Sequence, residues 1–285
     1  MKNNVILLDG AGGTVLWNLA ESLGYSKEPV WKYNIEHPEI VRQVAAEYVA
    51  AGSQIILANT FGANRPAVKR SSEYSVEEVV RAGVRLAKEA ATGSEVKVAL
   101  DVGPLTMLME PYGDLTEEEA EEIFREQIGA GMKEEPDLIL LETFLDLEML
   151  KVAAKVAKDY DVPVFCTMTF EGRGRTMMGN RVEDIVDELS ELGVDAVGLN
   201  CSQGPETALP VILEFAEHTD LPLIFKPNAG KPVMAADGSV SSPYDAADFV
   251  RDVEPALEKI AYLGGCCGSS PDYIRALKER LTRND

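Results

Sequence analysis

Residues 138–158, LILLETFLDLEMLKVAAKVAK, contain the pattern that decides the fold. Leu138–Thr143 is a short apolar run, as expected of a buried strand. Leu147–Lys158 places apolar residues three and four positions apart, as expected of an amphipathic helix. A strand followed directly by a helix is the repeating unit of α/β proteins.

The same unit recurs along the whole chain. Strands are predicted at Val5–Asp9, Gln54–Asn59, Val96–Asp101, Leu138–Thr143, Val164–Phe170, Ala196–Asn200, Leu223–Pro227 and Ile260–Gly264. Helices are predicted at Pro38–Ala51, Val76–Ala91, Glu117–Gly131, Leu147–Lys158, Val182–Leu192, Glu206–Glu217, Ala246–Glu258 and Asp272–Leu281. With no linker-like change in composition, this alternation favours a single (β/α)₈ TIM barrel over residues 1–285. An open doubly wound sheet is the alternative. Gly230–Ser242, after the seventh strand, is expected to form a loop over the barrel mouth.

Composition and charge narrow the classes of function. The chain has 285 residues, 46% of them hydrophobic, and a formal net charge of −21. This charge repels phosphate groups, so we expect neither a nucleic acid nor a membrane as partner. Acidic clusters such as Glu117–Glu119 are interpreted as solvated helix surface, at the start of a helix after Thr116. The N-terminus lacks the pattern of a signal peptide, so the expected location is cytoplasmic.

Reactive side chains gather at the carboxyl ends of the predicted strands, where barrel enzymes place their active sites. They are Asp9, Asn59, Asp101, Glu142, Cys201, Asn228, Cys266 and Cys267. The cysteines are far apart in the sequence, yet these strand ends meet at one rim of a barrel.

Three thiolates at neighbouring strand ends suit Zn²⁺, which prefers soft ligands in tetrahedral geometry. Three protein ligands leave the fourth position open, as in catalytic rather than structural zinc sites. The alternative is that the cysteines are small buried hydrophobic residues, and this is our interpretation of Cys166. For Cys201, Cys266 and Cys267 the nearby glycines favour the metal site instead, since the backbone freedom of glycine weakens the interior of a strand.

Six segments resemble the homocysteine S-methyltransferase family, and most of all the homocysteine-binding barrel of cobalamin-dependent methionine synthase. They are DGAGGTVL (9–16), NTFGAN (59–64), LLETF (140–144), GLNCSQGP (198–205), KPNAG (226–230) and GGCCGSSPDYI (264–274). They keep the family's order and cover essentially the whole chain.

The resemblance implies zinc held by the catalytic Cys201, Cys266 and Cys267, with the substrate sulfur as fourth ligand during turnover. It also implies that Asn228 fills the fourth position when substrate is absent, although this residue would alternatively cap the turn after Pro227. The substrate would be homocysteine, activated as a thiolate and methylated to methionine.

The substrate's two charged groups need partners of opposite charge. The resemblance implies that Asp9 and Glu142 hold the ammonium, whereas Asp9 would alternatively form a turn before Gly10. The backbone amides of Gly10 and Ala11, in a glycine-rich turn before a helix, are expected to receive the carboxylate. Asn59 and Asp101 either contact substrate or organise the rim loops.

The methyl donor is left open by the sequence. The chain stops soon after the eighth helix and lacks the corrinoid-binding motif of full-length methionine synthase, so a separate donor is expected. EGRGRTMMG (171–179) and KPNAG resemble methionine synthase and favour a separate corrinoid protein. S-methylmethionine and betaine are alternatives, as is a chain that is a fragment of a longer protein. Alternative hypotheses are a methyltransferase for another small thiol in a corrinoid demethylation system, or a non-catalytic zinc-binding subunit.

Overall fold

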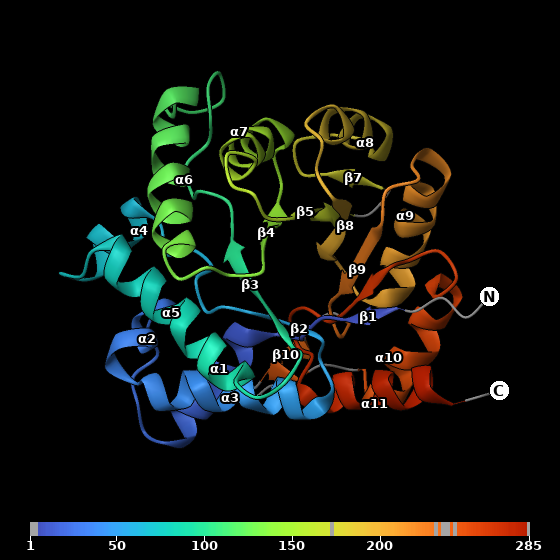
Figure 1. Ribbon diagram of the computed structural model, residues 1–285. Coiled ribbons are helices and arrows are strands. Elements are labelled where there is room, and N and C mark those ends of the chain that lie inside the picture. Colours follow the sequence, from blue (N-terminus) through green and yellow to red (C-terminus); the bar gives the residue numbers. More distant parts are fainter. Residues whose placement is uncertain (1–4, 172–173, 231–232, 235–239, 242–243, 284–285) are drawn as a thin grey trace.

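The predicted barrel is present in the computed structural model, which describes residues 5–171, 174–230, 233–234, 240–241 and 244–283 (Figure 1). Within these residues one sheet has eight parallel strands in the order β1-β12-β9-β8-β5-β4-β3-β2. They are β1 (Ile6–Leu7), β2 (Ile55–Leu57), β3 (Lys97–Val102), β4 (Leu138–Phe144), β5 (Val164–Met168), β8 (Ala196–Cys201), β9 (Leu223–Pro227) and β12 (Tyr262–Leu263). Each strand lies beside its successor along the chain, which is the order of a barrel and not of a doubly wound sheet.

Side chains help to close the barrel between β1 and β2. The Gln54 backbone N–H donates to the Leu7 carbonyl at 2.7 Å, and the Leu7 N–H donates to the Gln54 side chain at 3.1 Å. Further along both segments, the Leu57 N–H donates to the Asp9 carboxylate at 2.7 Å. The predicted first strand, Val5–Asp9, is therefore too long: β1 ends at Leu7, and beyond it the Asp9 side chain takes the place of a backbone acceptor.

Helices form the outer ring around these strands (Figure 1). The longer ones are α1 (Gly12–Ser22), α3 (Pro38–Ala51), α5 (Val76–Ala91), α6 (Glu117–Met132), α7 (Leu147–Ala157), α8 (Val182–Glu191), α9 (Pro205–His218), α10 (Ala246–Val253) and α11 (Pro271–Thr282). Short segments are η1 (Val30–Lys32), α2 (Tyr33–Glu36), α4 (Arg65–Ser71) and η2 (Glu254–Ala256). Seven of the eight predicted helices match within about two residues. The predicted Ala246–Glu258 is too long, because Pro255 has no N–H to continue the helix and the chain turns into η2.

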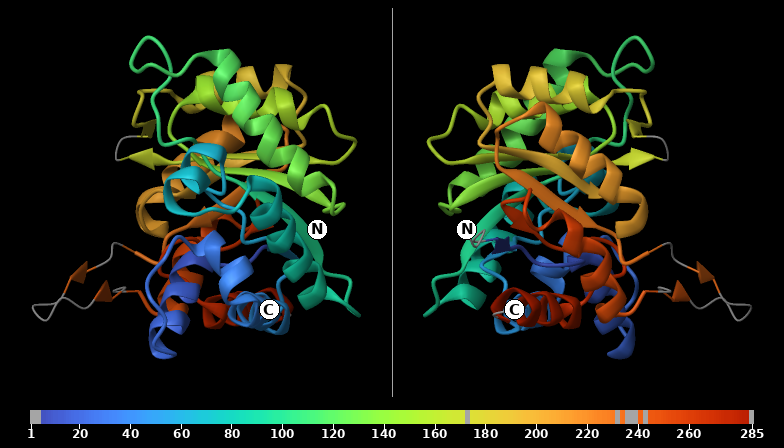
Figure 2. Two further views of the ribbon diagram at one scale, coloured as in Figure 1. Left: turned by 90° about the vertical axis from the view of Figure 1, so that its left-hand side faces the viewer. Right: turned by 90° about the vertical axis from the view of Figure 1, so that its right-hand side faces the viewer.

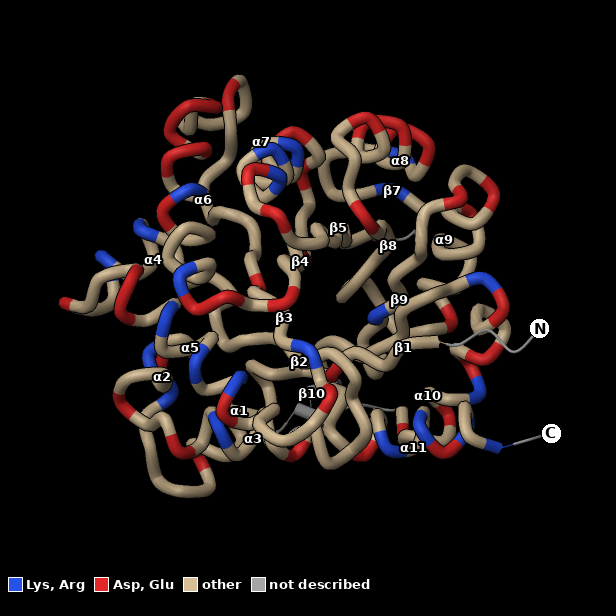
Figure 3. The backbone as a smooth tube through the Cα atoms, viewed as in Figure 1, with Lys and Arg blue, Asp and Glu red and all other residues tan. Residues whose placement is uncertain are grey.

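Acidic residues lie mainly on this outer ring, mixed with lysines and arginines (Figure 3). The predicted helix start after Thr116 is confirmed: the Thr116 hydroxyl accepts from the Glu119 N–H, and the Glu119 carboxylate accepts from the Thr116 N–H. This reciprocal cap explains part of the acidic cluster by local backbone chemistry. None of the helices in the described ranges has the length and apolar character needed to cross a membrane.

The loops that follow the strands lie together on one side of the barrel, at the left of the left-hand panel of Figure 2. Two small hairpins project there, one formed by β6 (Phe170–Glu171) and β7 (Arg175–Thr176), the other by β10 (Val233–Met234) and β11 (Val240–Ser241). Gly230–Ser242 was expected to be a loop and contains the second hairpin; 231–232, 235–239 and 242 lie outside the described residues. Gly172 and Arg173 of the EGRGRTMMG segment also lie outside them.

The barrel interior is apolar below the carboxyl ends of the strands. Leu8, Ile55, Ala99, Leu138, Leu140, Phe165, Ala196 and Ile224 form one buried cluster, with residues from or next to seven of the strands. Successive strand residues point to opposite faces, so residues two positions further along face inward as well. Two positions beyond Ala99, Leu140 and Ile224 stand Asp101, Glu142 and Lys226. The apolar interior is therefore covered by a charged layer at its carboxyl end.

Candidate active site

A cavity of about 310 Å³ opens at the carboxyl ends of the strands. Its walls include the charged layer, the glycine-rich turn after β1 and the cysteines; Asp9, Gly10, Ala11, Asn59, Asp101, Glu142, Cys201, Cys266 and Cys267 all line it. Of the residues proposed from the sequence, only Asn228 is not among its lining residues. The predicted convergence of these residues on one rim is thus present in the structure.

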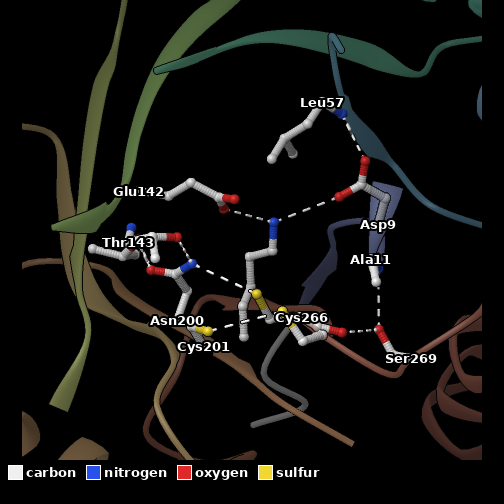
Figure 4. Close-up of polar contacts among 12 residues, drawn as sticks. Asp9, Ala11, Leu57, Glu142, Thr143, Asn200, Cys201, Cys266 and Ser269 are labelled. Atoms are coloured by element: carbon white, nitrogen blue, oxygen red, sulfur yellow. Dashed lines mark hydrogen bonds and ion pairs between the residues drawn. The ribbon is translucent and has the colours of Figure 1, made fainter. Parts of the chain in front are cut away.

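Lys226 lies at the centre of the charged layer, and its role was missed in the sequence. Asp9 and Glu142 point toward one another (Figure 4), and the Lys226 ammonium lies between them, 3.1 Å from Glu142 Oε2 and 3.5 Å from Asp9 Oδ1. All three side chains are almost fully buried. Its position two residues after the inward-facing Ile224 was the signal that would have placed this lysine inside the barrel.

Burial and mutual charge shift the pKa values of these groups. Burial raises the pKa of Asp9 to about 6, although the Lys226 charge acts in the opposite direction. Burial, with the Glu142 charge second, raises the pKa of Asp101 well above its usual range. Burial alone would lower the pKa of Lys226, but Glu142 and Asp9 together raise it, so this lysine is a permanent cation.

The three cysteines come from the ends of β8 and β12, which are not neighbours as the sequence suggested, because β9 lies between them in the sheet. Cys201 ends β8 in a left-handed backbone conformation, φ 55°, and Cys266 and Cys267 follow β12. The second segment is fixed by backbone bonds from Gly265 N–H to the Asp9 carbonyl and from Cys266 N–H to the Pro227 carbonyl. The three sulfur atoms lie within 4.8 Å of one another, and those of Cys201 and Cys267 are 4.0 Å apart.

This cluster fits a metal ion bound by sulfur. Tetrahedral zinc with bonds of about 2.3 Å separates two sulfur ligands by about 3.8 Å, close to the spacing observed here. Hydrogen bonds from Cys201 and Cys266 lower the pKa of the Cys267 thiol to about 3, whereas hydrogen bonds with Cys266 and Cys267 raise that of Cys201. Thiols so close to one another share protons, and three thiolates together require a cation. The cluster can therefore hold a metal.

Asn228 is bonded to both cysteine segments. Its N–H donates to the Cys201 carbonyl at 3.2 Å, and the N–H of the next residue, Ala229, donates to the Cys267 carbonyl at 2.9 Å. The side-chain nitrogen donates to the Ser202 carbonyl at 2.9 Å, while the buried Oδ1 has no hydrogen-bond partner in the described part of the chain. An amide oxygen left unpaired in this way is available as a ligand.

Asn200 is a second residue whose role was missed. Its Oδ1 accepts from the Thr143 N–H at 2.7 Å and the Thr167 hydroxyl at 2.8 Å (Figure 4). Its Nδ2 donates to the Thr143 hydroxyl at 2.7 Å and points toward Cys266 Sγ at 3.7 Å. Asn200 thus orients a cysteine through a fully paired side chain, as supporting residues of metal sites do.

The glycine-rich turn is packed against the second cysteine segment. The Ser269 hydroxyl donates to the Cys266 carbonyl at 2.7 Å and accepts from the Ala11 N–H at 3.2 Å, so this amide already has a partner. A side chain on Gly10 would meet the Ser269 and Tyr48 hydroxyls at 2.7 and 2.8 Å, which only glycine avoids. The buried Tyr48 hydroxyl lines the cavity and lacks a hydrogen-bond partner among the residues described.

Asn59 joins loops. Its amide nitrogen donates to the Val30 carbonyl and the Asn34 side chain, both at 2.7 Å, while Asn34 donates to the Asn59 carbonyl at 2.7 Å. Both hydrogens of the Asn59 amide are therefore used within the rim. Asp101 differs, because its Oδ1 is buried without a hydrogen-bond partner within the described ranges.

Comparisons with known proteins show which family the chain resembles. A family model described as Homocysteine S-methyltransferase matches residues 6–281. The chain is 27% identical to methionine synthase of Mycobacterium leprae over 88% of this chain and 22% of the relative. It is 30% identical to S-methylmethionine–homocysteine S-methyltransferase of Pongo abelii, over 92% of this chain and 75% of that one.

Solved structures share the fold. Homocysteine methyltransferase MmuM from Escherichia coli, in its oxidized form, has a TM-score of 0.81 at 24% identity, covering 98% of this chain and 97% of the other. Its metallated form has a TM-score of 0.80 with the same identity and coverage. By contrast, the chain spans only about a fifth of the length of the two mycobacterial methionine synthases that it matches.

Proposed function

The chain belongs to the homocysteine S-methyltransferase family, and we propose on that basis that it transfers a methyl group to the sulfur of homocysteine, yielding methionine. The observation that carries the proposal is the cluster of Cys201, Cys266 and Cys267 on the wall of a cavity that also holds buried carboxylates. A metal site and an amino-acid site thus share one small space.

We propose Zn²⁺ as the metal, held by Cys201, Cys266 and Cys267, with the unpaired Oδ1 of Asn228 as a displaceable fourth ligand. When bound, zinc lowers the pKa of a coordinated thiol so that the sulfur remains a nucleophilic thiolate near neutral pH. Asn228 is suited to a temporary role, because its Nδ2 bond to Ser202 holds the amide in place whether or not Oδ1 is engaged.

The remaining residues bind and orient the amino acid. Asp9 and Glu142 provide negative charge for the substrate ammonium, and the charge of Lys226 between them favours the ionised form of both against the effect of burial. The turn at Gly10 and Ala11 precedes the N-terminus of α1, which favours the substrate carboxylate. With both ends fixed, the sulfur has one orientation, and catalysis of an in-line displacement comes mainly from positioning.

The methyl donor is proposed to be a separate molecule, with a methyl-corrinoid protein the first candidate from the EGRGRTMMG and KPNAG segments. The names of the relatives point to two small alternatives, S-methylmethionine for one and betaine for another, the betaine–homocysteine S-methyltransferase 1 of Mus musculus. All three donors lose a methyl group and leave a stable product, so none requires a general acid.

The test is methionine formation from homocysteine by the zinc-loaded protein, measured by mass spectrometry with methylcobalamin, methyltetrahydrofolate, S-methylmethionine or betaine as donor. Activity with at least one donor, lost in Cys267→Ala, is expected. Cys166→Ala is the matched control, because Cys166 is fully buried in β5 and does not belong to the cluster. No methionine with any donor, or equal activity in Cys267→Ala, would contradict the proposal.

A further inference from the structure

We propose that Asp101 is a specificity residue of the same site, which accepts the substrate ammonium together with Asp9 and makes the site select thiols that carry an amine. This inference rests on the proposed function, because it concerns how that site tells homocysteine from other small thiols. It goes beyond the pairing of Asp9 and Glu142, since it assigns part of the recognition to a third carboxylate.

Asp101 is placed rigidly at the cavity wall. It lies in β3, two positions after the inward-facing Ala99, and its backbone carbonyl accepts from the Thr60 hydroxyl at 2.7 Å. Gln127 in turn donates to the Thr60 carbonyl at 2.9 Å, so the loop beside Asp101 is fixed to α6. The backbone at Asp101 is thus fixed, and the residue is only 6% exposed.

Lys226 does not pair with every carboxylate around it. Its ammonium contacts Glu142 and Asp9, while Asp101 Oδ1 has no hydrogen-bond partner among the described residues. Asp9 Oδ1, at 3.5 Å from the lysine, likewise receives no hydrogen bond within the described chain. Two buried carboxylate oxygens on the wall of one cavity thus accept no hydrogen bond from the described residues, although that of Asp9 has the Lys226 charge nearby.

The charge balance points to the group that would supply those donors. The described residues that line the cavity carry three carboxylates and one ammonium. A buried carboxylate without a cation or a donor is costly, which is why the pKa of Asp101 is raised, and a cationic donor beside it would favour its ionised form. The ammonium of an amino acid is such a donor, and its three N–H groups can bond several oxygens at once.

Selectivity follows from the same imbalance. A thiol without an amine would enter the cavity and give neither oxygen a hydrogen bond, whereas the ammonium of homocysteine would donate to both. A hydrogen bond to a charged group is worth about 10- to 100-fold in binding. Asp101→Asn keeps the shape of the side chain but cannot become an anion when an ammonium binds beside it, so it should reduce the preference for the amine by about this factor.

The experiment is calorimetric titration of the zinc-loaded protein with homocysteine and with 4-mercaptobutanoate, which has the thiol and carboxylate but no amine. Wild type is expected to bind homocysteine more tightly. Asp101→Asn should lose about 10- to 100-fold in affinity for homocysteine and keep its affinity for 4-mercaptobutanoate within about threefold. Asp114→Asn, an exposed aspartate in the loop after β3, is the matched control and should behave as wild type.

Three results would overturn the inference. An unchanged affinity for homocysteine in Asp101→Asn, or an equal loss of affinity for both ligands, would show that Asp101 does not recognise the amine. Wild type that binds neither thiol would instead defeat the proposed function, and the inference with it. Thermal unfolding checks that Asp101→Asn is folded, and Asp101→Ser should show the same loss of selectivity.

Discussion

Removal of the Lys226 ammonium tests the electrostatics of the site most severely. In Lys226→Met the volume of the side chain is nearly kept, but Asp9 and Glu142 face each other without a cation. At 3.5 and 3.1 Å, and an effective dielectric constant of about 20, each attraction to the ammonium amounts to about 5 kcal/mol. Much of this is offset by the loss of hydration of three buried charges.

The net loss of unfolding free energy in Lys226→Met is expected to be about 3–5 kcal/mol near neutral pH, as for other broken buried pairs. It should shrink as the pH falls. Without the lysine the pKa values of both carboxyls rise further in the folded protein, and protonation then removes their repulsion. The variant therefore regains part of its lost stability in acid.

The assay is urea unfolding of metal-free protein at about pH 7.5 and about pH 5. Lys155→Met is the matched control, because Lys155 pairs with Glu117 on the surface, where both side chains are more than half exposed. The control should change stability by less than about 0.5 kcal/mol. Undiminished stability of Lys226→Met at both pH values, or an equal loss at both, would refute the account of this layer.

Three further changes have defined outcomes. Cys267→Ala should lower zinc content from about one per chain to near zero with an unchanged circular dichroism spectrum, since Cys267 lies at the exposed rim; global unfolding would indicate a structural metal instead. Tyr48→Phe should leave thermal stability unchanged or raise it by about 1 kcal/mol, because it removes a buried hydroxyl without a partner among the described residues; a clear loss would reveal such a partner. Asp9, with a folded pKa of about 6 against 3.8, favours folding in acid. Wild type should therefore lose about 3 kcal/mol of unfolding free energy relative to Asp9→Asn between about pH 3 and pH 7 in urea unfolding; parallel pH curves would contradict this shift.

The barrel could be predicted because each unit repeats its own signal. The helix at Pro38–Ala51 was placed to the residue, since Pro38 at its start and Gly52 after its end punctuate the chain. The strand ends were less certain. β1 has only two residues, and the predicted strand ran on to Asp9 because a side chain that substitutes for a ladder bond leaves no trace in an apolar pattern.

The candidate site could be predicted only as far as residue type and strand position allowed. The cysteines and carboxylates were found because such groups at strand ends are conspicuous. Lys226 and Asn200 were missed, because a polar residue inside an apolar strand shows its direction only once the inward face is known. The sequence also did not show that the Ala11 N–H and the Asn59 side-chain amide already have hydrogen-bond partners. The partner of Ala11 is the hydroxyl of Ser269, which is far away in the sequence, and that of Asn59 is the backbone carbonyl of Val30.

The central claim, that Cys201, Cys266 and Cys267 hold zinc and leave one position to the substrate sulfur, is tested most directly by zinc X-ray absorption. Spectra of the zinc-loaded protein are compared with and without homocysteine. Three sulfur neighbours and one lighter atom, becoming four sulfur neighbours on addition of homocysteine, is the predicted result. A shell that does not change when homocysteine is added would contradict the claim.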